Sequence, residues 1–248
     1  VGRILEEARR TGMVKITIDH PLARYHRFET ELVDTFGLQS AVVVPVQAND
    51  ELTMEFVTRM AAQRLSEWRP RPRVVAVSWG RTTAHVAQHL GSGWNPHLAS
   101  PDRRGISRFR GDAALDVSVS RPLEAAQNAD LVVYSPGTVS ADSILVTAGH
   151  VTTNGIDQLR SKGASADIMS HYVDAHGRVV DEELDARTIS VDLDGVKVRD
   201  DGATVALGSE RLVVASGAEK AEALGVALRG GLCTDLVVDA SVAELALG

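Results

Sequence analysis

The stretch VVAVSWGRTTAHVAQHL, residues 74–90, places a glycine, an arginine and two threonines where an apolar strand-like run meets a helix-like run. Helix N-termini offer backbone N–H groups without intrahelical partners and a partial positive charge, which suits an anion such as phosphate. Gly80 would allow close backbone approach, Thr82 and Thr83 carry hydroxyl donors, and Arg81 adds a counter-charge. The candidate anion-binding residues are therefore Ser78, Gly80, Arg81, Thr82 and Thr83.

Lys220 is a second candidate, in the stretch VVASGAEKAEALGVAL, residues 213–228. A β-branched strand again ends in small residues and a helix follows, which puts Lys220 in the first turn of that helix. The helix dipole opposes a cation at this end, and a nearby anion would make the position favourable. Lys220 is therefore also a candidate for binding an anion.

Both junctions have an alternative interpretation that needs no ligand. Thr82 could cap its helix, since a Ser or Thr at the N-cap stabilises a helix by ~1 kcal/mol. Lys220 could be a solvated surface lysine whose charge is offset by the neighbouring Glu219. The local sequence leaves both alternatives open.

Asp167 is the third candidate, in the stretch GASADIMSHYVDAHG, residues 163–177. Small and apolar side chains surround it, and a carboxylate is rarely buried without partners. It could bind substrate hydroxyls or act as a general base, or it could cap a turn through an Asx-type hydrogen bond. His171 and His176 are interpreted as turn or surface residues, and Asp174 as support for the turn at His176.

The elements that must position these residues alternate between strand and helix, which predicts an α/β fold with a mostly parallel, Rossmann-like sheet covered by helices on both faces. A smaller subdomain is expected around residues 100–200, where residues 91–112 predict a loop. Predicted helices span residues 1–13, 21–37, 49–68, 83–90, 122–129, 152–163, 218–231 and 240–248. Predicted strands span residues 14–19, 40–45, 73–79, 130–135, 211–217 and 234–239, with a strand pair over 164–180 that turns at residues 176–177.

Composition limits the function classes. With 33 acidic against 26 basic residues among 248, the net charge is −7, which argues against a nucleic-acid surface on this chain. No apolar run approaches the roughly 18 residues of a membrane helix. The single cysteine, Cys233, excludes an internal disulfide, and no His/Cys spacing suits zinc. We expect a cytoplasmic protein with no membrane partner, no metal and no cofactor.

Several blocks, in this order, resemble the effector-binding domain of SorC/DeoR-type bacterial transcriptional regulators. The resemblance covers nearly the whole chain, from the segment that follows the N-terminal DNA-binding domain in this family. The blocks are VGRILEEARRTGMVKITID, FETELVDTFGLQSAVVVP, VSWGRTTAHVA, GASADIMSHYVDAHG, GAEKAEALGVALRGG and TDLVVDASVAELAL.

The resemblance implies a fold related to sugar-phosphate isomerases and glucosamine-6-phosphate deaminase. Residues 1–248 would form one effector-binding domain without catalytic residues, and DNA would be bound only through an N-terminal helix-turn-helix domain absent from this chain. The effector would be a phosphorylated sugar or related metabolite. Its phosphate would lie at Ser78, Gly80, Arg81, Thr82 and Thr83 with Lys220, and Asp167 would meet sugar hydroxyls.

The resemblance also implies a homodimer or homotetramer, and apolar residues near both chain ends, such as Ile4 and Leu245, agree with this expectation. Helices that merely pack on their own sheet would also explain these residues. The alternative function is a sugar-phosphate isomerase or deaminase with Asp167 as base and Lys220 as anchor or electrophile. Two departures from the family pattern are Ala166 before the acidic residue and Ser216 where paired glycines are common. The span from Thr83 to Gly163 is also shorter than in the family.

Overall fold

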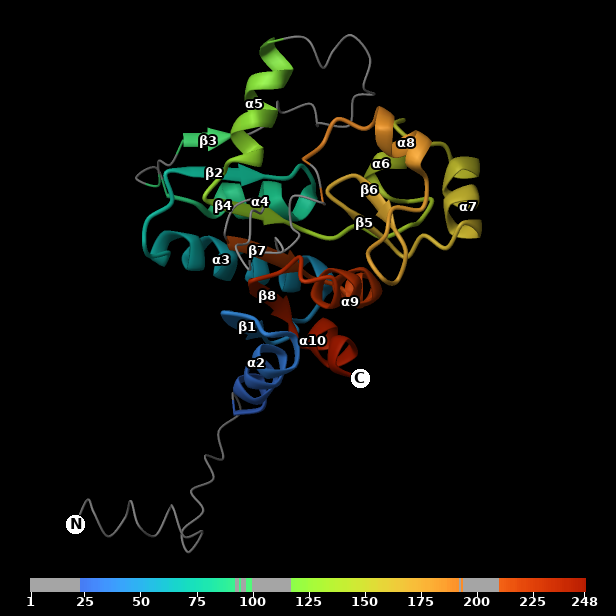
Figure 1. The fold of residues 1–248 in the computed structure, drawn as a ribbon. Coiled ribbons are helices and arrows are strands. Elements are labelled where there is room, and N and C mark those ends of the chain that lie inside the picture. Colours follow the sequence, from blue (N-terminus) through green and yellow to red (C-terminus); the bar gives the residue numbers. More distant parts are fainter. Residues whose placement is uncertain (1–22, 92–93, 95–96, 100–116, 192, 194–209) are drawn as a thin grey trace, which may run out of the picture.

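The structure is a computed structural model that describes residues 23–91, 94, 97–99, 117–191, 193 and 210–248. Within these residues, its centre is a six-stranded sheet in the order β1-β8-β7-β4-β2-β3 (Figure 1). Every neighbouring pair of strands in this sheet is parallel. The strands are β1 (Ser40–Val44), β2 (Val74–Val77), β3 (His97–Ala99), β4 (Leu131–Tyr134), β7 (Glu210–Ala215) and β8 (Asp235–Asp239).

Alternate residues of the buried strands pack on opposite faces of the sheet, as the two-residue period of a strand requires. In β7, Leu212 and Val214 belong to one hydrophobic cluster, whereas Val213 and Ala215 belong to the cluster on the other face. Helices cover both faces, which confirms the predicted α/β fold. They are α3 (Asp50–Glu67) and α4 (Arg81–His89) on one face, and α2 (Ala23–Phe36), α5 (Val117–Gln127), α9 (Ala221–Arg229) and α10 (Ala240–Leu247) on the other.

Helix boundaries follow local capping signals. The side chain of Asn49 accepts a hydrogen bond of 2.8 Å from the Leu52 backbone N–H and caps α3. Gly37, with φ of +67°, follows the end of α2 in a conformation that favours glycine. The predicted helices over residues 21–37 and 49–68 are therefore confirmed to within two residues at each end.

A small lobe, residues 137–191, lies beside the C-terminal ends of the central strands (Figure 1). It contains the antiparallel pair β5 (Ala166–Ile168) and β6 (His171–Val173) together with α6 (Ile144–Thr147), α7 (Thr153–Ser161) and α8 (Glu182–Arg187). Its own hydrophobic cluster is built on Val139, Leu145, Ile156, Leu159 and Tyr172.

Three predictions for this half of the chain are corrected. Within the predicted loop over 91–112, residues 97–99 form β3, which pairs with β2 at the sheet edge. The helix predicted from Pro122 begins at Val117, so Pro122 lies inside the helix, where its ring removes one intrahelical N–H donor. The predicted turn at residues 176–177 is present, since Val173 pairs with Val179 across it, but the stretch also turns at Met169 and Ser170, both with positive φ, where β5 meets β6. The predicted elements within residues 1–19 lie outside the described residues.

The strand order creates a topological switch point between β2 and β4. From β2 the chain runs outward to β3, and from β4 it runs the opposite way to β7, although β2 and β4 are neighbours. Loops that leave adjacent strands in opposite directions open a crevice at their C-terminal ends, where ligands bind in open α/β sheets.

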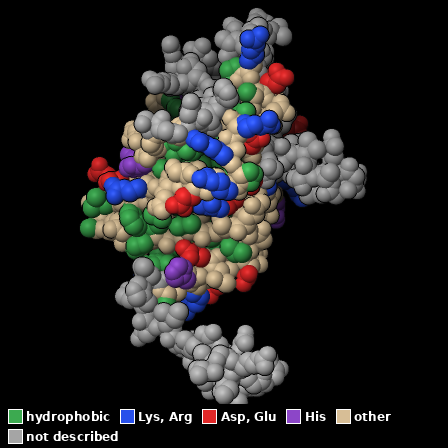
Figure 2. Space-filling model, turned by 90° about the vertical axis from the view of Figure 1, so that its left-hand side faces the viewer, with side chains coloured by type: hydrophobic (Ala, Val, Ile, Leu, Met, Phe, Trp, Pro, Cys, Tyr) green, Lys and Arg blue, Asp and Glu red, His purple; other side chains and the backbone are tan. Residues whose placement is uncertain are grey.

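The surface shown in Figure 2 carries acidic and basic side chains interspersed with one another. Over the part of the chain that is described, no helix combines the length and apolarity that crossing a membrane requires.

Candidate functional site

A cavity of about 490 Å³ opens at this switch point. The loops after β2 and β4, the first turn that follows β7, and the turn between β5 and β6 all contribute to its wall. Its polar lining includes Ser78, Gly80, Arg81, Thr82, Ser135, Thr138, Asp142, Ser143, Asp167, Ser170, Ser190, Glu219 and Lys220. Its apolar lining includes Met54, Ala76, Ala126, Val132, Met169 and Val191.

The loop after β2 forms a cradle at the N-terminus of α4. Gly80 precedes the helix with φ of +151°, a backbone conformation that residues with side chains rarely adopt. Its carbonyl accepts the Ala84 N–H at 3.0 Å, so the N–H groups of the three residues between them have no acceptor within the helix. These N–H groups and the partial positive charge of the helix end can hold an anion.

Lys220 ends η3 (Ala218–Lys220) and its side chain reaches across the strand ends to this cradle. Its Nζ donates to Ser135 Oγ at 2.6 Å and to Thr82 Oγ1 at 3.2 Å. The lysine is half-buried, and this burial lowers its pKa to about 8, while the charges of Glu219 and Asp167 act in the opposite direction. Lys220 is therefore not a fully solvated lysine, although Glu219 offsets part of the cost of its charge, as the alternative expected.

Asp167 lies in β5 on the same cavity wall. Its Oδ1 accepts a hydrogen bond from the Ser170 N–H at 2.7 Å, so the Asx-type turn considered as an alternative is present. Burial raises the pKa of the carboxyl to about 6, although the Ser170 bond and the charges of His171 and Lys220 lower it. Turn formation uses one oxygen of Asp167, and the residue still lines the cavity.

Gly137 fixes the position of this carboxylate. The backbones of Gly137 and Asp167 exchange two hydrogen bonds of 2.8 and 2.9 Å, which join the β4 loop to β5. A Cβ on Gly137 would lie 2.9 Å from Asp167 Oδ2 and 3.1 Å from its Cβ. Only glycine allows this approach without a shift of the aspartate.

The structure brings six of the seven predicted site residues to the cavity, and these are Ser78, Gly80, Arg81, Thr82, Asp167 and Lys220. Thr83 is the exception, because its side chain is buried and donates to the Gly80 carbonyl at 3.1 Å. The N-cap of α4 is Gly80 and no side chain caps the helix, so the interpretation of Thr82 as an N-cap is also wrong.

The sequence prediction missed two parts of the cavity wall. Ser135, Gly137 and Thr138 follow the buried strand β4, in the same pattern of strand and small residues that marked the other junctions. That pattern could have found them. Ser190 and Val191 follow α8, and no local pattern sets them apart.

The two histidines of the 163–177 stretch differ. His176 is exposed at a turn, and Asp174 accepts the His176 and Arg178 N–H groups, as predicted. His171 was predicted at a turn or at the surface, but it is 5% exposed and lies inside the small lobe. Its position in β6, opposite Ile168, turns its side chain inward.

The cavity is suited to binding. Among its described lining residues, the carboxylates are Asp142, Asp167 and Glu219, and no histidine is present. Proton abstraction at carbon needs a base and a partner for the developing negative charge, and the lining offers no second group paired with Asp167 by a hydrogen bond. No group of three or more His, Cys, Asp or Glu side chains within the described ranges could hold a metal ion.

Comparison with known proteins identifies a sugar-binding domain and relatives that are transcriptional regulators. A family model described as "Putative sugar-binding domain" matches residues 20–100 and 114–248. The transcriptional regulator LsrR of Enterobacter sp. (strain 638) is 26% identical over 279 residues, which cover 100% of this chain and 83% of that protein. The deoxyribonucleoside regulator of Bacillus subtilis (strain 168) is 23% identical over 285 residues, which cover 98% and 87% of the two proteins.

Solved structures share the fold. A DeoR family transcriptional regulator from Listeria monocytogenes has a TM-score of 0.77 at 20% identity, over 90% of this chain and 99% of that one. The full-length sorbitol operon regulator SorC from Klebsiella pneumoniae also has a TM-score of 0.77, at 18% identity, over 100% and 89% of the two chains.

Proposed function

This chain belongs to the sugar-binding-domain family of SorC/DeoR-type bacterial transcriptional regulators, and on that premise we propose that it is the ligand-sensing domain of such a regulator. The ligand is a phosphorylated sugar or a related small metabolite, and it binds in the cavity at the switch point. Its binding changes the affinity of a separate helix-turn-helix domain of the regulator for operator DNA. The domain works in the cytoplasm and performs no catalysis.

The main support for the proposal is that the side chain of Lys220 lies against the first turn of α4. The Lys220 ammonium lies against Thr82 Oγ1 at the helix N-terminus, and both of its hydrogen-bond acceptors are neutral hydroxyls. A phosphate bound at Gly80 would accept hydrogen bonds from the free N–H groups of α4 and would form an ion pair with this ammonium. The anion would also favour the charged form of Lys220, which burial alone disfavours.

Asp167 supplies the second half of the recognition. A carboxylate accepts hydrogen bonds only, so the free lone pairs of Asp167 suit the hydroxyl groups of a sugar. The cavity volume of about 490 Å³ falls within the roughly 300–1,000 Å³ of small-molecule sites. Cation and carboxylate on one wall would orient a ligand with an anionic end and a hydroxyl-bearing body.

We also propose a homodimer or homotetramer as the working assembly, because operator half-sites are read in pairs by symmetric proteins. In α10, Val242 is buried against the body of its own chain, whereas Leu245 is 57% exposed. Sedimentation of the isolated domain tests this part. A strict monomer with and without sugar phosphate would contradict it.

A thermal-shift panel of sugar phosphates and the corresponding free sugars tests the ligand class, because a ligand that binds only the folded state raises the melting temperature. We expect stabilisation by at least one phosphorylated sugar and a much smaller effect of its unphosphorylated form. In Lys220→Met, calorimetry should show affinity lower by roughly ten- to a hundredfold, the value of one or two charge-assisted hydrogen bonds.

Lys162→Met is the matched control, because Lys162 is exposed and pairs with Asp181 in the small lobe at 2.7 Å, outside the cavity lining. This variant should bind the sugar phosphate as the wild type does. Equal affinity in Lys220→Met and wild type would refute the phosphate assignment.

A further inference from the structure

His171 joins two segments of the small lobe next to the cavity. Its Nδ1 lies 2.5 Å from Asp185 Oδ1 in α8, and its Nε2 lies 2.8 Å from the Val191 carbonyl oxygen. Val191 lines the cavity, and so does Ser190, whose hydroxyl donates to the Met169 carbonyl at 2.6 Å. The ring therefore ties α8 and the 190–191 wall to the turn that carries Asp167.

Both partners of the ring are hydrogen-bond acceptors. A carboxylate and a carbonyl oxygen have no proton to donate, so each ring nitrogen must carry one for both bonds to form. A neutral imidazole has a single N–H and leaves one of the two acceptors unpaired. The geometry matches the doubly protonated ring, which is a cation with Asp185 as its counter-ion.

We propose that His171 is a positioning residue of the ligand site: as an imidazolium it holds the 190–191 wall in place and sets the charge environment of Asp167. This inference rests on the proposed function for its effect on ligand binding, whereas the state of the ring can be measured without any ligand. The two hydrogen bonds of His171 go to Asp185 and Val191, which are outside the predicted anion cradle, so its role differs from that of Lys220.

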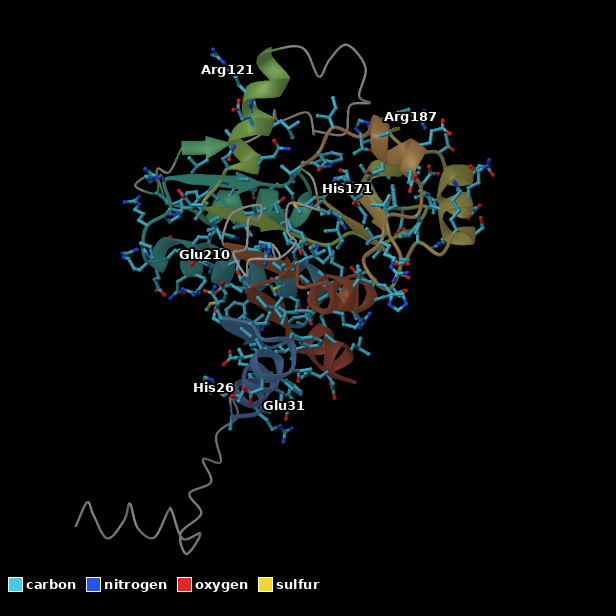
Figure 3. All side chains as sticks on the ribbon, viewed as in Figure 1. His26, Glu31, Arg121, His171, Arg187 and Glu210 are labelled. Atoms are coloured by element: carbon cyan, nitrogen blue, oxygen red, sulfur yellow. The ribbon has the colours of Figure 1, made fainter. Side chains whose placement is uncertain are left out.

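The charges around His171 come from several elements. Asp167 in β5 interacts with it electrostatically, and this interaction lowers the pKa of the Asp167 carboxyl. Asp185 in α8 is its direct partner. Arg187 and His150 line a small cavity beside its neighbours Ser170 and Tyr172. Figure 3 shows His171 in the interior of the lobe and Arg187 on α8 toward the outside.

Two consequences follow for a variant without the cation, such as His171→Gln. The glutamine amide can donate to only one of the two acceptors unless it leaves the ring's position, so the wall is held less firmly. Loss of the His171 charge also raises the pKa of the Asp167 carboxyl, because that charge lowers it in the wild type. The aspartate then takes up its proton at a higher pH than in the wild type.

The first arm of the test needs no ligand. In ¹⁵N-histidine-labelled full chain at pH 6.5, two-bond correlations should show both ring nitrogens of His171 protonated, with His171→Gln assigning the signal. In ¹³C-aspartate-labelled chain, the Asp167 carboxyl should titrate at higher pH in His171→Gln than in wild type. A single neutral tautomer for the ring, or an unchanged Asp167 titration, would overturn the proposal.

The second arm uses ribose 5-phosphate and fructose 6-phosphate as probes in calorimetry at pH 6.5 and pH 8. His171→Gln should bind the sugar phosphate roughly tenfold more weakly than wild type at pH 6.5. The loss of affinity should be smaller at pH 8, because Asp167 is deprotonated in both proteins at that pH. A purely structural defect would weaken binding equally at both values, which would count against the charge role. His176→Gln, the same substitution at an exposed turn, should match the wild type at both.

Two outcomes separate this inference from the proposed function. If neither probe binds the wild type, these two sugar phosphates are excluded as ligands. The NMR measurements of the first arm then decide alone whether His171 is an imidazolium. If His171→Gln does not fold, Asp185→Asn removes the charged partner from the half-buried end of the same interaction. That variant should change the ring signal of His171 in a chain with wild-type circular dichroism, and an unchanged signal would overturn the proposal.

Discussion

A carboxylate lies near a basic side chain at each end of the central sheet, Asp235 within the sheet and Asp167 in the small lobe beside it, and the two surroundings differ. At the N-terminal end, Asp235 is 1% exposed and accepts hydrogen bonds from Ser40, Thr234 and Arg64 at 2.5, 3.0 and 3.1 Å. At the C-terminal end, Asp167 accepts one hydrogen bond from Ser170 and otherwise faces the cavity. One carboxylate is enclosed by protein donors, and the other has acceptor capacity left over.

The difference separates a structural charge from one available to a ligand. A buried carboxylate with a complete set of donors holds elements together, here β1, α3 and β8. A carboxylate with a raised pKa and incomplete donors costs stability in the free domain, and such groups concentrate at functional sites. Lys220, whose pKa is lowered and whose hydrogen bonds to Thr82 and Ser135 go to neutral hydroxyls, is the cationic counterpart at the same end of the sheet.

The largest effect is expected at the N-terminal end. Asp235→Ala should lower the free energy of unfolding by about 3 kcal/mol, because it removes three hydrogen bonds and leaves Arg64 without its carboxylate partner. Arg64 is 32% exposed, so solvent offsets part of the loss. Urea denaturation measures the change, and Asp157→Ala on the exposed side of α7 should stay within about 0.5 kcal/mol. Comparable losses of unfolding free energy in both variants would show that Asp235 stabilises the fold no more than a surface aspartate does.

Asp167→Asn should show the opposite pattern, with binding lost and stability gained. Sugar-phosphate affinity should fall roughly tenfold at pH 7.5, because the strongest acceptor for ligand hydroxyls is gone. Because the folded-state pKa of Asp167 is raised to about 6, the free domain loses stability as pH rises from the usual carboxyl pKa to about 6, where the unfolded state alone has released the proton. The variant should therefore be more stable than wild type by about 1 kcal/mol at pH 7.5, and equal to it at pH 4.

Melting curves of the free domain at the two pH values measure this gain. A wild type that is more stable than Asp167→Asn at pH 7.5 would show that the aspartate is a structural group like Asp235.

Gly137→Ala tests the role of Asp167 through the backbone. The added Cβ would lie 2.9 Å from Asp167 Oδ2, so the carboxylate must move. We expect sugar-phosphate affinity to fall several-fold to roughly tenfold, the cost of misplacing one charged hydrogen bond. Calorimetry measures it against Gly91→Ala, where nothing lies within 4 Å of the new Cβ. Unchanged affinity in Gly137→Ala would argue against a contact between Asp167 and the ligand.

The smallest effect distinguishes two neighbouring threonines. Thr82→Val removes a hydroxyl that accepts from Lys220, and binding should weaken about fivefold, the worth of one neutral hydrogen bond. Thr83→Val removes a hydroxyl bonded to the Gly80 carbonyl, and should affect stability more than affinity. Side-by-side titration with one sugar phosphate checks this order. A larger affinity loss in Thr83→Val would place its hydroxyl at the ligand after all.

Local signals accounted for most of the fold. The β-branched runs predicted β1, β2, β4, β7 and β8, and capping residues such as Asn49 and Gly37 marked the helix ends. These signals are informative because helix caps, and the repeat of buried side chains along a helix or a strand, involve residues close in sequence. The same signals failed for β3, which has three residues, and for the turn at Met169, where residues other than glycine have positive φ.

Short stretches of the chain are enough to predict strand-to-helix junctions with glycine and hydroxyl side chains at residues 78–83 and 216–220, since each is a local pattern. The tertiary structure places β4 between β2 and β7, which brings Ser135 to Lys220 across 85 positions of sequence. It also decided that Thr83 points inward and that His171 is buried between α8 and the cavity wall. Strand order and packing depend on contacts between distant segments, and no short stretch of sequence contains that information.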